Sequence, residues 1–248
     1  MDTLPLTGER TVPGVPAENY WFRRHEVAYR FVAPLVAGRR VLEVGCGEGY
    51  GTALLADGAG TILGVDYDAL TVAHAAAAYP RTRFVRANLA ALPIRGAFVD
   101  VVATLQVIEH VWNHGEFVRE CGRVLRPGGL LVVTTPNRLT FSPGQDSPRN
   151  PFHAREFTAA ELTELLTGHG FADARLYGLH AGARLAALDE AHGGSLVDAQ
   201  LAAPPGQWSA ELAADVTSVT CDDFAIVPAG ERDVSRSLDL VVLLRRPG

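Results

Sequence analysis

The stretch VLEVGCGEGYG, residues 41–51, decides the fold of this chain. Its branched apolar residues predict a short buried strand, and its four glycines predict a tight turn into a helix. Backbone amides at a helix start point outward, and missing side chains let a ligand come close. The turn is therefore expected to cradle a ligand. The alternative is that the glycines only let the strand and the helix pack closely.

Composition restricts the class of protein. The chain has 248 residues, is 48% hydrophobic and carries a formal charge of −6. That length and apolar content suffice for one full core. Its 22 Lys and Arg residues are scattered, which argues against a nucleic-acid partner and favours a small or neutral one.

The cysteines and the apolar runs bear on location. Cys46, Cys121 and Cys221 lack metal-type spacing and are odd in number, which argues against a disulfide framework. No signal-like start and no run of about 20 apolar residues is present, so no membrane segment is expected. The sequence therefore predicts a cytoplasmic protein.

Short apolar runs alternate with helical stretches along the first two thirds of the chain. This alternation predicts a parallel sheet covered by helices on both faces. An amphipathic helix ending near Pro34 precedes the first strand. The runs expected to form strands are RVLEVG, TILGVD, RFVRAN, VDVVATL and GLLVVTT.

The end of the chain is organised differently. FADARLYGL predicts a sixth strand and LDLVVLLRR a last strand, and residues 179–236 between them are too many for an ordinary connection. We expect one domain over residues 1–248. Its parts are an N-terminal arm and helix (1–37), a core (38–178), an insertion covering the substrate (179–236) and a last strand (237–248).

The glycine turn does not match the dinucleotide fingerprint, because Tyr50 or Thr52 occupies the position of its last glycine. The pattern present is E-x-G-x-G-x-G, and it resembles motif I of the class I S-adenosylmethionine-dependent methyltransferases. GVDYD, RANLAALP, VDVVATLQVIEHV and RVLRPGGLLVVTTPN are similar to later motifs of that family, in the same order.

This resemblance implies a Rossmann-like α/β fold with a seven-stranded, mostly parallel sheet whose last strand is antiparallel, and S-adenosylmethionine as cofactor. Asp66 matches the carboxylate that holds the ribose, although capping of a helix is an alternative role. Asn88 stands where the family more often has Asp. Cys46 is expected to line the turn and not to act as a nucleophile. The expected cofactor-binding residues are Glu43, Gly45, Cys46, Gly47, Gly49, Asp66, Tyr67, Asn88, Leu89 and Gln106.

The loops after the fourth and fifth strands should face the transferable methyl group, because ligands of parallel sheets lie beyond the carboxyl ends of the strands. They carry Gln106, Glu109, His110 and His153. QVIEH resembles the E-x-x-E-H element of Mg²⁺-binding methyltransferases, with Gln106 in place of the first Glu. The resemblance implies Glu109, His110 and His153 as metal ligands. One carboxylate with imidazoles is a weak set of ligands for a hard cation. Alternatively, Glu109 and His110 only cap the following helix or pair within it.

A hydroxyl acceptor needs a base or an acidifying cation, because it is protonated at neutral pH. His153 and His110 are the candidate bases, and Glu109 completes the catalytic set. Tyr20, Arg24 and His25 could meet the cofactor's carboxylate, while Asp189 and His192 in the insertion could bind hydroxyl groups.

Several stretches together resemble a mycobacterial group of methyltransferases tied to polymethylated polysaccharides, the methylglucose lipopolysaccharides and their methylmannose relatives. They are LTGERTVPGVPAENYWFRRH, VLEVGCGEGYG, QVIEHVWNHGEFVREC, TPNRLTFSPGQDSPRNPFHARE and HGGSLVDAQ. This resemblance implies O-methylation of a glucose- or mannose-containing saccharide. A phenolic or quinone-precursor acceptor and a non-catalytic cofactor-binding module are the alternatives. A homodimer formed through the insertion is a further expectation.

Overall fold

The structure is a computed structural model that describes residues 11–248, so the prediction for the first ten residues of the arm lies outside it. Eight strands form one sheet in the order β3-β2-β1-β4-β5-β8-β6-β7. The strands are β1 (Arg40–Val44), β2 (Thr61–Asp66), β3 (Arg83–Arg86), β4 (Val99–Leu105), β5 (Leu125–Pro136), β6 (Ala172–Ala181), β7 (Phe224–Pro228) and β8 (Asp239–Arg245).

The first five strands are parallel, and β8 runs antiparallel between β5 and β6. This confirms the predicted Rossmann-like fold with an antiparallel last strand. The count of seven strands is too low by one, because the insertion supplies β7, which pairs antiparallel with β6 at the sheet edge. The five residues of β7 gain their ladder of hydrogen bonds only from β6, which lies more than forty residues earlier in the chain.

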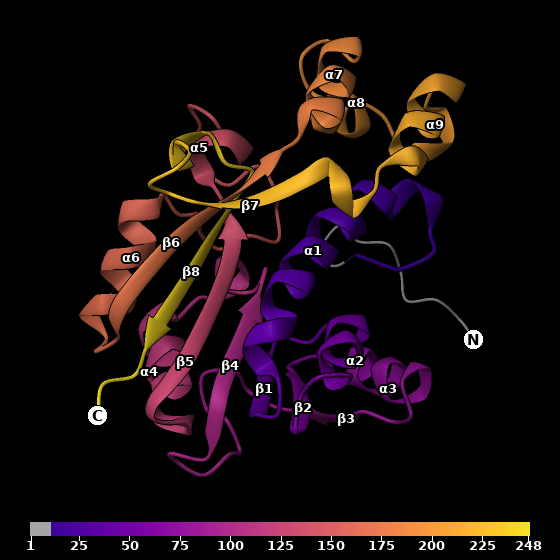
Figure 1. Cartoon of the computed structure of the whole chain (residues 1–248). Helices are drawn as coiled ribbons and strands as arrows, with labels where there is room; N and C mark the ends of the chain where they lie inside the picture. Colours follow the sequence, from indigo (N-terminus) through magenta and orange to yellow (C-terminus); the bar gives the residue numbers. More distant parts are fainter. Residues whose placement is uncertain (1–10) are drawn as a thin grey trace.

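Helices cover both faces of the sheet, as the alternating pattern predicts (Figure 1). They are α1 (Asn19–Val32), α2 (Tyr50–Ala56), α3 (Ala69–Ala78), α4 (His114–Val124), α5 (Arg138–Phe141), α6 (Ala159–Gly168), α7 (Ala183–Ala191), α8 (Leu196–Leu201) and α9 (Ala210–Ser218). Single turns of 3₁₀ helix connect several of them, and one of these, η3 (Ile108–His110), follows β4. Among residues 11–248, no helix is long and apolar enough to cross a membrane.

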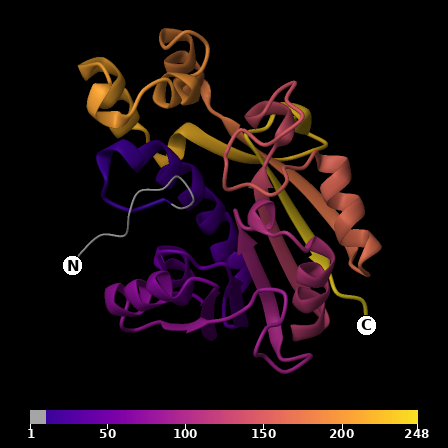
Figure 2. The same ribbon diagram turned by 180° about the vertical axis from the view of Figure 1, so that it is seen from behind.

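Two apolar layers sandwich the sheet. Successive residues of a strand point to opposite faces, so Val41 of β1 packs with Tyr29 and Val32 of α1, whereas its neighbour Leu42 packs with Phe117 of α4. The rear view shows α4 and α6 over the second of these faces (Figure 2). A third apolar cluster joins the N-terminal turn of α1 to the insertion through residues such as Tyr20, Leu196 and Val216. The insertion therefore has a small core of its own and sits beyond the carboxyl ends of β4 and β5 (Figure 1).

A buried ion pair fixes α1 against the last strand. Arg24 donates to both carboxylate oxygens of Asp239, at 2.7 and 2.5 Å, and to the carbonyl oxygen of Leu238 at 2.7 Å. The two side chains are 3% and 2% exposed. Asp239 is the first residue of β8 and lies opposite Pro136, the last residue of β5. The pair therefore ties α1 to the end of the sheet where the cofactor and acceptor are expected.

Removing one partner of this pair should be costly. We expect Arg24→Met to lower the free energy of unfolding by about 3–5 kcal/mol, because Asp239 would stay buried without its counter-charge. The double variant Arg24→Met/Asp239→Leu should recover most of that loss, since neither charge remains. Urea unfolding of both variants measures this, and equal losses in the single and double variants would contradict it.

Candidate active site

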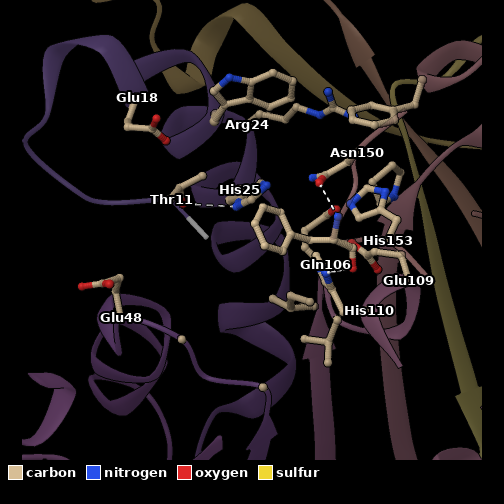
Figure 3. Close-up of a pocket in the computed structure, with 18 of the residues that line it drawn as sticks. Thr11, Glu18, Arg24, His25, Glu48, Gln106, Glu109, His110, Asn150 and His153 are labelled. Carbon is tan, nitrogen blue, oxygen red and sulfur yellow. Dashed lines mark hydrogen bonds between the residues drawn. The ribbon is translucent and has the colours of Figure 1, made fainter. Parts of the chain in front are cut away.

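A cavity of about 960 Å³ lies beyond the carboxyl ends of the parallel strands. Its walls come from the glycine turn, α1, the loops after β4 and β5, and residues 200–208 of the insertion. The close-up shows Thr11 and His25 on the N-terminal wall, with Gln106, Glu109, His110 and His153 on the opposite wall (Figure 3). The size suits a small-molecule site and leaves room for both a cofactor and an acceptor.

The glycines of the turn do two different things. Gly45, Gly47 and Gly49 all have positive φ angles, at 80°, 49° and 84°, which favour glycine. A side chain on Gly45 would collide with Val107, and one on Gly49 would come within 2.7 Å of Ala75 and 2.9 Å of Phe84. A side chain on Gly47 would meet nothing within 4 Å. Close packing therefore explains Gly45 and Gly49, whereas Gly47 borders open space in the cavity.

Glu43 lies beneath the turn and not in the cavity wall. It is fully buried, and its two carboxylate oxygens accept hydrogen bonds from the Tyr29 hydroxyl, at 2.6 Å, and from the Thr52 hydroxyl. Burial raises the pKa of Glu43 to about 7. The structure thus differs from the prediction of direct cofactor contact at Glu43, and likewise at Gly49, because both residues face the protein interior. Glu43 instead joins β1, α1 and α2 around the turn.

The other residues predicted to bind the cofactor do line the cavity. They are Gly45, Cys46, Gly47, Asp66, Tyr67, Asn88, Leu89 and Gln106. The Asp66 carboxylate accepts hydrogen bonds from the backbone N–H groups of Gly47, at 2.9 Å, and Asp68, at 3.0 Å. Asp68 caps α3, so the capping role considered for Asp66 is wrong. Burial raises the pKa of the Cys46 thiol, which agrees with a lining role.

The N-terminal helix supplies the wall opposite the β4 loop. Arg24 and His25 line the cavity, whereas Tyr20 is turned into the core of the insertion. His25 Nδ1 lies 3.3 Å from the Thr11 hydroxyl, and burial lowers the pKa of His25 to about 4. His25 is therefore an uncharged polar group of this wall, while the charge of Arg24 is balanced by Asp239.

Glu109, His110 and His153 come together at the far wall, as predicted. One potential ligand atom from each lies within 4.8 Å of those of the other two. Gln106, the first residue after β4, has a positive φ of 58° and donates to the Thr134 hydroxyl, so residues 106–110 are not one regular helical turn. Glu109 is 1% exposed and accepts a hydrogen bond from Thr135 at 2.8 Å, and burial raises its pKa to about 8. Asn113 caps α4, so the capping role considered for Glu109 and His110 is wrong.

Hydrogen bonds set the orientation of both histidines. Nδ1 of His110 lies 3.0 Å from the carbonyl oxygen of Phe152, and Nδ1 of His153 lies 2.8 Å from Glu156 Oε1. A carbonyl or carboxylate oxygen can only accept, so each Nδ1 carries the proton. The lone pair of the neutral His153 ring is therefore on Nε2, which can take a metal ion or a proton.

The donor set fits a divalent cation, although Mg²⁺ is not its best match. Glu109 offers one oxygen and the histidines two nitrogens, whereas Mg²⁺ prefers oxygen ligands in octahedral geometry. Two imidazoles and a carboxylate are typical of ions such as Mn²⁺, Fe²⁺ and Zn²⁺. For any of these ions, oxygens of water or of the acceptor would have to complete the coordination.

Comparison with known proteins identifies the family of this chain. A methyltransferase domain model matches residues 42–133. The chain is 57% identical over 246 residues to a probable S-adenosylmethionine-dependent methyltransferase of Mycolicibacterium smegmatis, covering 98% of this chain and 96% of that protein. It is 38% identical over 106 residues to a ubiquinone biosynthesis O-methyltransferase of a Caulobacter species, covering 41% and 42%.

Comparison with solved structures finds the same fold. A Thermotoga maritima structure described as an S-adenosylmethionine-dependent methyltransferase, possible histamine N-methyltransferase, superimposes with a TM-score of 0.64 at 16% identity, over 91% of this chain and 92% of that one. The fold and the glycine turn define a class I methyltransferase. This chain belongs to the S-adenosylmethionine-dependent methyltransferases, and S-adenosylmethionine is its cofactor.

Sequence reasoning missed several residues around the site. Tyr29 and Thr52, which hold Glu43, carry no local signal, because they lie 14 and 9 residues away from it, beyond the reach of turn and periodicity patterns. Glu156 could have been found from its position three residues after His153. In the insertion, the cavity wall is formed by residues such as Gln200 and Trp208. Asp189 and His192 do not reach the cavity. Asp189 accepts from the Leu196 backbone and His192 pairs with Asp215.

The different surroundings of two glycines give a direct test of the turn. We expect Gly49→Ala to lower the free energy of unfolding by about 2–4 kcal/mol through overpacking and backbone strain. Gly47→Ala should cost only the strain, about 1–2 kcal/mol, but should weaken S-adenosylhomocysteine binding because its methyl group enters the cavity. Urea unfolding and titration calorimetry measure the two effects. A Gly47→Ala protein with wild-type affinity would contradict the cradle.

The buried Glu43 carboxyl should make stability depend on pH. Its pKa rises from 4.5 in the unfolded chain to about 7 in the fold, so the folded state binds the extra proton and the free energy of unfolding falls as pH rises through that window. The total fall should be on the order of 3 kcal/mol. Because Glu109 contributes a slope of the same sign, the measurement compares Glu43→Gln with the wild type between pH 5 and 8. Equal slopes would contradict the assignment.

Proposed function

We propose that this methyltransferase transfers the methyl group of S-adenosylmethionine to a hydroxyl of a glucose- or mannose-containing saccharide. The observation that carries the proposal is the Glu109, His110 and His153 cluster, which faces the same cavity as the glycine turn. Methyl transfer from a sulfonium is an in-line displacement, so the protein has to align the acceptor and remove its proton.

His153 is suited to take the proton of the acceptor. Its Nδ1–H donates to Glu156, which leaves the Nε2 lone pair as the accepting site. As Nε2 takes up a proton, the Glu156 carboxylate stabilises the resulting imidazolium. Removal of the proton in this way is typically worth about 10²–10⁴-fold in rate.

A divalent cation held by Glu109, His110 and His153 would lower the pKa of a hydroxyl that binds to it. Mg²⁺ is the ion that the sequence resemblance implies, and the donor set favours Mn²⁺ or a similar ion over it. In that state His153 is a ligand, and the chain's own contribution is to hold the acceptor oxygen beside the methyl group. A chelator distinguishes the two roles of His153. It should abolish activity if His153 is a metal ligand and leave activity unchanged if His153 acts as the base.

Polar and aromatic groups of the cavity wall support a saccharide acceptor. Gln200 from the insertion lines the cavity and adds a polar amide to its wall. Trp21 and Trp208 also line the cavity and offer flat faces for the apolar side of a sugar ring. Such a role fits synthesis of polymethylated polysaccharides, which the full-length sequence resemblance implies.

A phenolic or quinone-precursor acceptor is the second candidate. Phe141 and Phe152 line the cavity beside His153, and the ring centroids of Phe141 and His153 are 5.5 Å apart. Aromatic rings in this place suit a flat apolar acceptor. The partial match to a ubiquinone biosynthesis O-methyltransferase points in the same direction. A catechol and a sugar diol share two adjacent oxygens, which both suit the cluster.

Methyl incorporation tests the two acceptor classes side by side. The protein is incubated with labelled S-adenosylmethionine and either short gluco- and manno-oligosaccharides or a catechol, with Mn²⁺, with Mg²⁺ or with a chelator. We expect incorporation into the saccharide, and a His153→Ala rate about 10²–10⁴-fold lower because the proton acceptor or metal ligand is gone. The matched control is His192→Ala, whose histidine also pairs with a carboxylate but lies outside the cavity. Incorporation only into the catechol would overturn the saccharide proposal.

A further inference from the structure

We propose that Glu156 is a positioning residue of the active site, which acts through His153 and supplies the second negative charge of the cluster. The inference rests on the proposed function in one respect, the use of His153 Nε2 in the site. Glu156 itself lies behind His153 and does not line the cavity.

The Glu156 and His153 side chains form a close, buried pair. They are 1% and 4% exposed, and Glu156 Oε1 lies 2.8 Å from His153 Nδ1. Histidines that ligate metals commonly donate their second ring N–H to a carboxylate, which fixes the tautomer and makes the ligating nitrogen a stronger donor. Glu156 stands in that relation to His153, so it presents Nε2 to Glu109 and His110.

Backbone hydrogen bonds of the surrounding loop fix the position of this pair relative to Glu109. The backbone N–H groups of Ala154 and Arg155 donate to the carbonyl oxygen of Glu109, at 2.7 and 3.1 Å. The His153 ring also lies between Phe141 and His110, with centroid distances of 5.5 and 4.9 Å. These contacts fix the position of the ring, and the bond to Glu156 decides which nitrogen faces the cluster.

The charges of the site give Glu156 a second role. The cluster holds one carboxylate and two imidazoles, so Glu109 is the single acid among the candidate ligands. Glu156 Oε2 is buried and has no hydrogen-bond partner among residues 11–248. A buried carboxylate with one partner is costly unless a positive charge balances it. A divalent cation at Nε2 would provide that charge, and with Glu109 and Glu156 the site would then be close to neutral.

The two histidines of the cluster differ in the group that accepts the hydrogen bond from Nδ1. His110 donates its Nδ1–H to the uncharged carbonyl of Phe152, whereas His153 donates to a carboxylate. A hydrogen bond to a charged acceptor is shorter and roughly twice as strong as one between neutral groups. The bond to Glu156 therefore makes Nε2 of His153 a stronger ligand for a cation than Nε2 of His110.

Metal affinity measured without turnover tests this role. Titration calorimetry with Mn²⁺ on the full-length protein compares the wild type with Glu156→Gln, which keeps the size and one acceptor oxygen but removes the charge. We expect the Mn²⁺ affinity of Glu156→Gln to fall about 10–100-fold. The matched control is Asp215→Asn, which removes the charge from a second histidine–carboxylate pair with the same 2.8 Å distance, away from the cluster. It should bind Mn²⁺ like the wild type.

A second readout on the same variant separates this inference from the proposed function. The Nδ1–H proton resonance of His153 should move upfield in Glu156→Gln, because the acceptor is no longer charged. If the wild type binds no Mn²⁺, the metal part of the proposed function fails, and this shift still decides the role of Glu156. An unchanged resonance, or equal Mn²⁺ affinity in Glu156→Gln and a wild type that binds the ion, would overturn the inference.

Discussion

The buried ion pair between Arg24 and Asp239 is the constraint on which the arrangement of the site depends. Asp239 begins β8 beside the last residue of β5. The pair therefore fixes the middle of α1 at the carboxyl ends of the parallel strands. Somewhat further along the same helix, Tyr29 holds Glu43 beneath the glycine turn. One rigid helix thus sets the distance between the cofactor cradle and the wall that carries Glu109. Buried charges are held in this way only when both partners are present.

Burial acts in the same direction on two acidic groups, Glu43 and Glu109, but their partners give them different roles. Glu43 and Glu109 both have raised pKa values because they lie away from water, at about 7 and about 8. Hydroxyl groups from Tyr29 and Thr52 occupy both oxygens of Glu43, so its role is to brace the turn. Glu109 belongs to a cluster that faces the cavity, so a cation bound there would favour its charged form. The hydrogen-bond partners of the two carboxyl groups, and not their depth of burial, therefore distinguish the structural role of Glu43 from the candidate reactive role of Glu109.

The insertion connects one wall of the cavity to the N-terminal helix. Its own apolar cluster includes Tyr20 of α1, and its residues 200–208 form one side of the cavity. Arg149, in the loop after β5, also reaches across to Asp198 of the insertion. The insertion therefore forms one side of the cavity from a core of its own, and α1 and the loop after β5 hold it in place.

Local sequence determined the fold class, the glycine turn and the loops that carry Glu109, His110 and His153, because periodicity and turn chemistry act over a few residues. Only the tertiary structure decided which members of those motifs face the cavity. Glu43 and Gly49 turn inward, since their partners belong to other helices and strands, such as Tyr29 of α1 and Phe84 of β3. The same holds for β7, whose ladder depends on β6. The Glu156 bond to His153 spans three residues, but its burial against the cluster arises only when the loop folds over the end of the sheet.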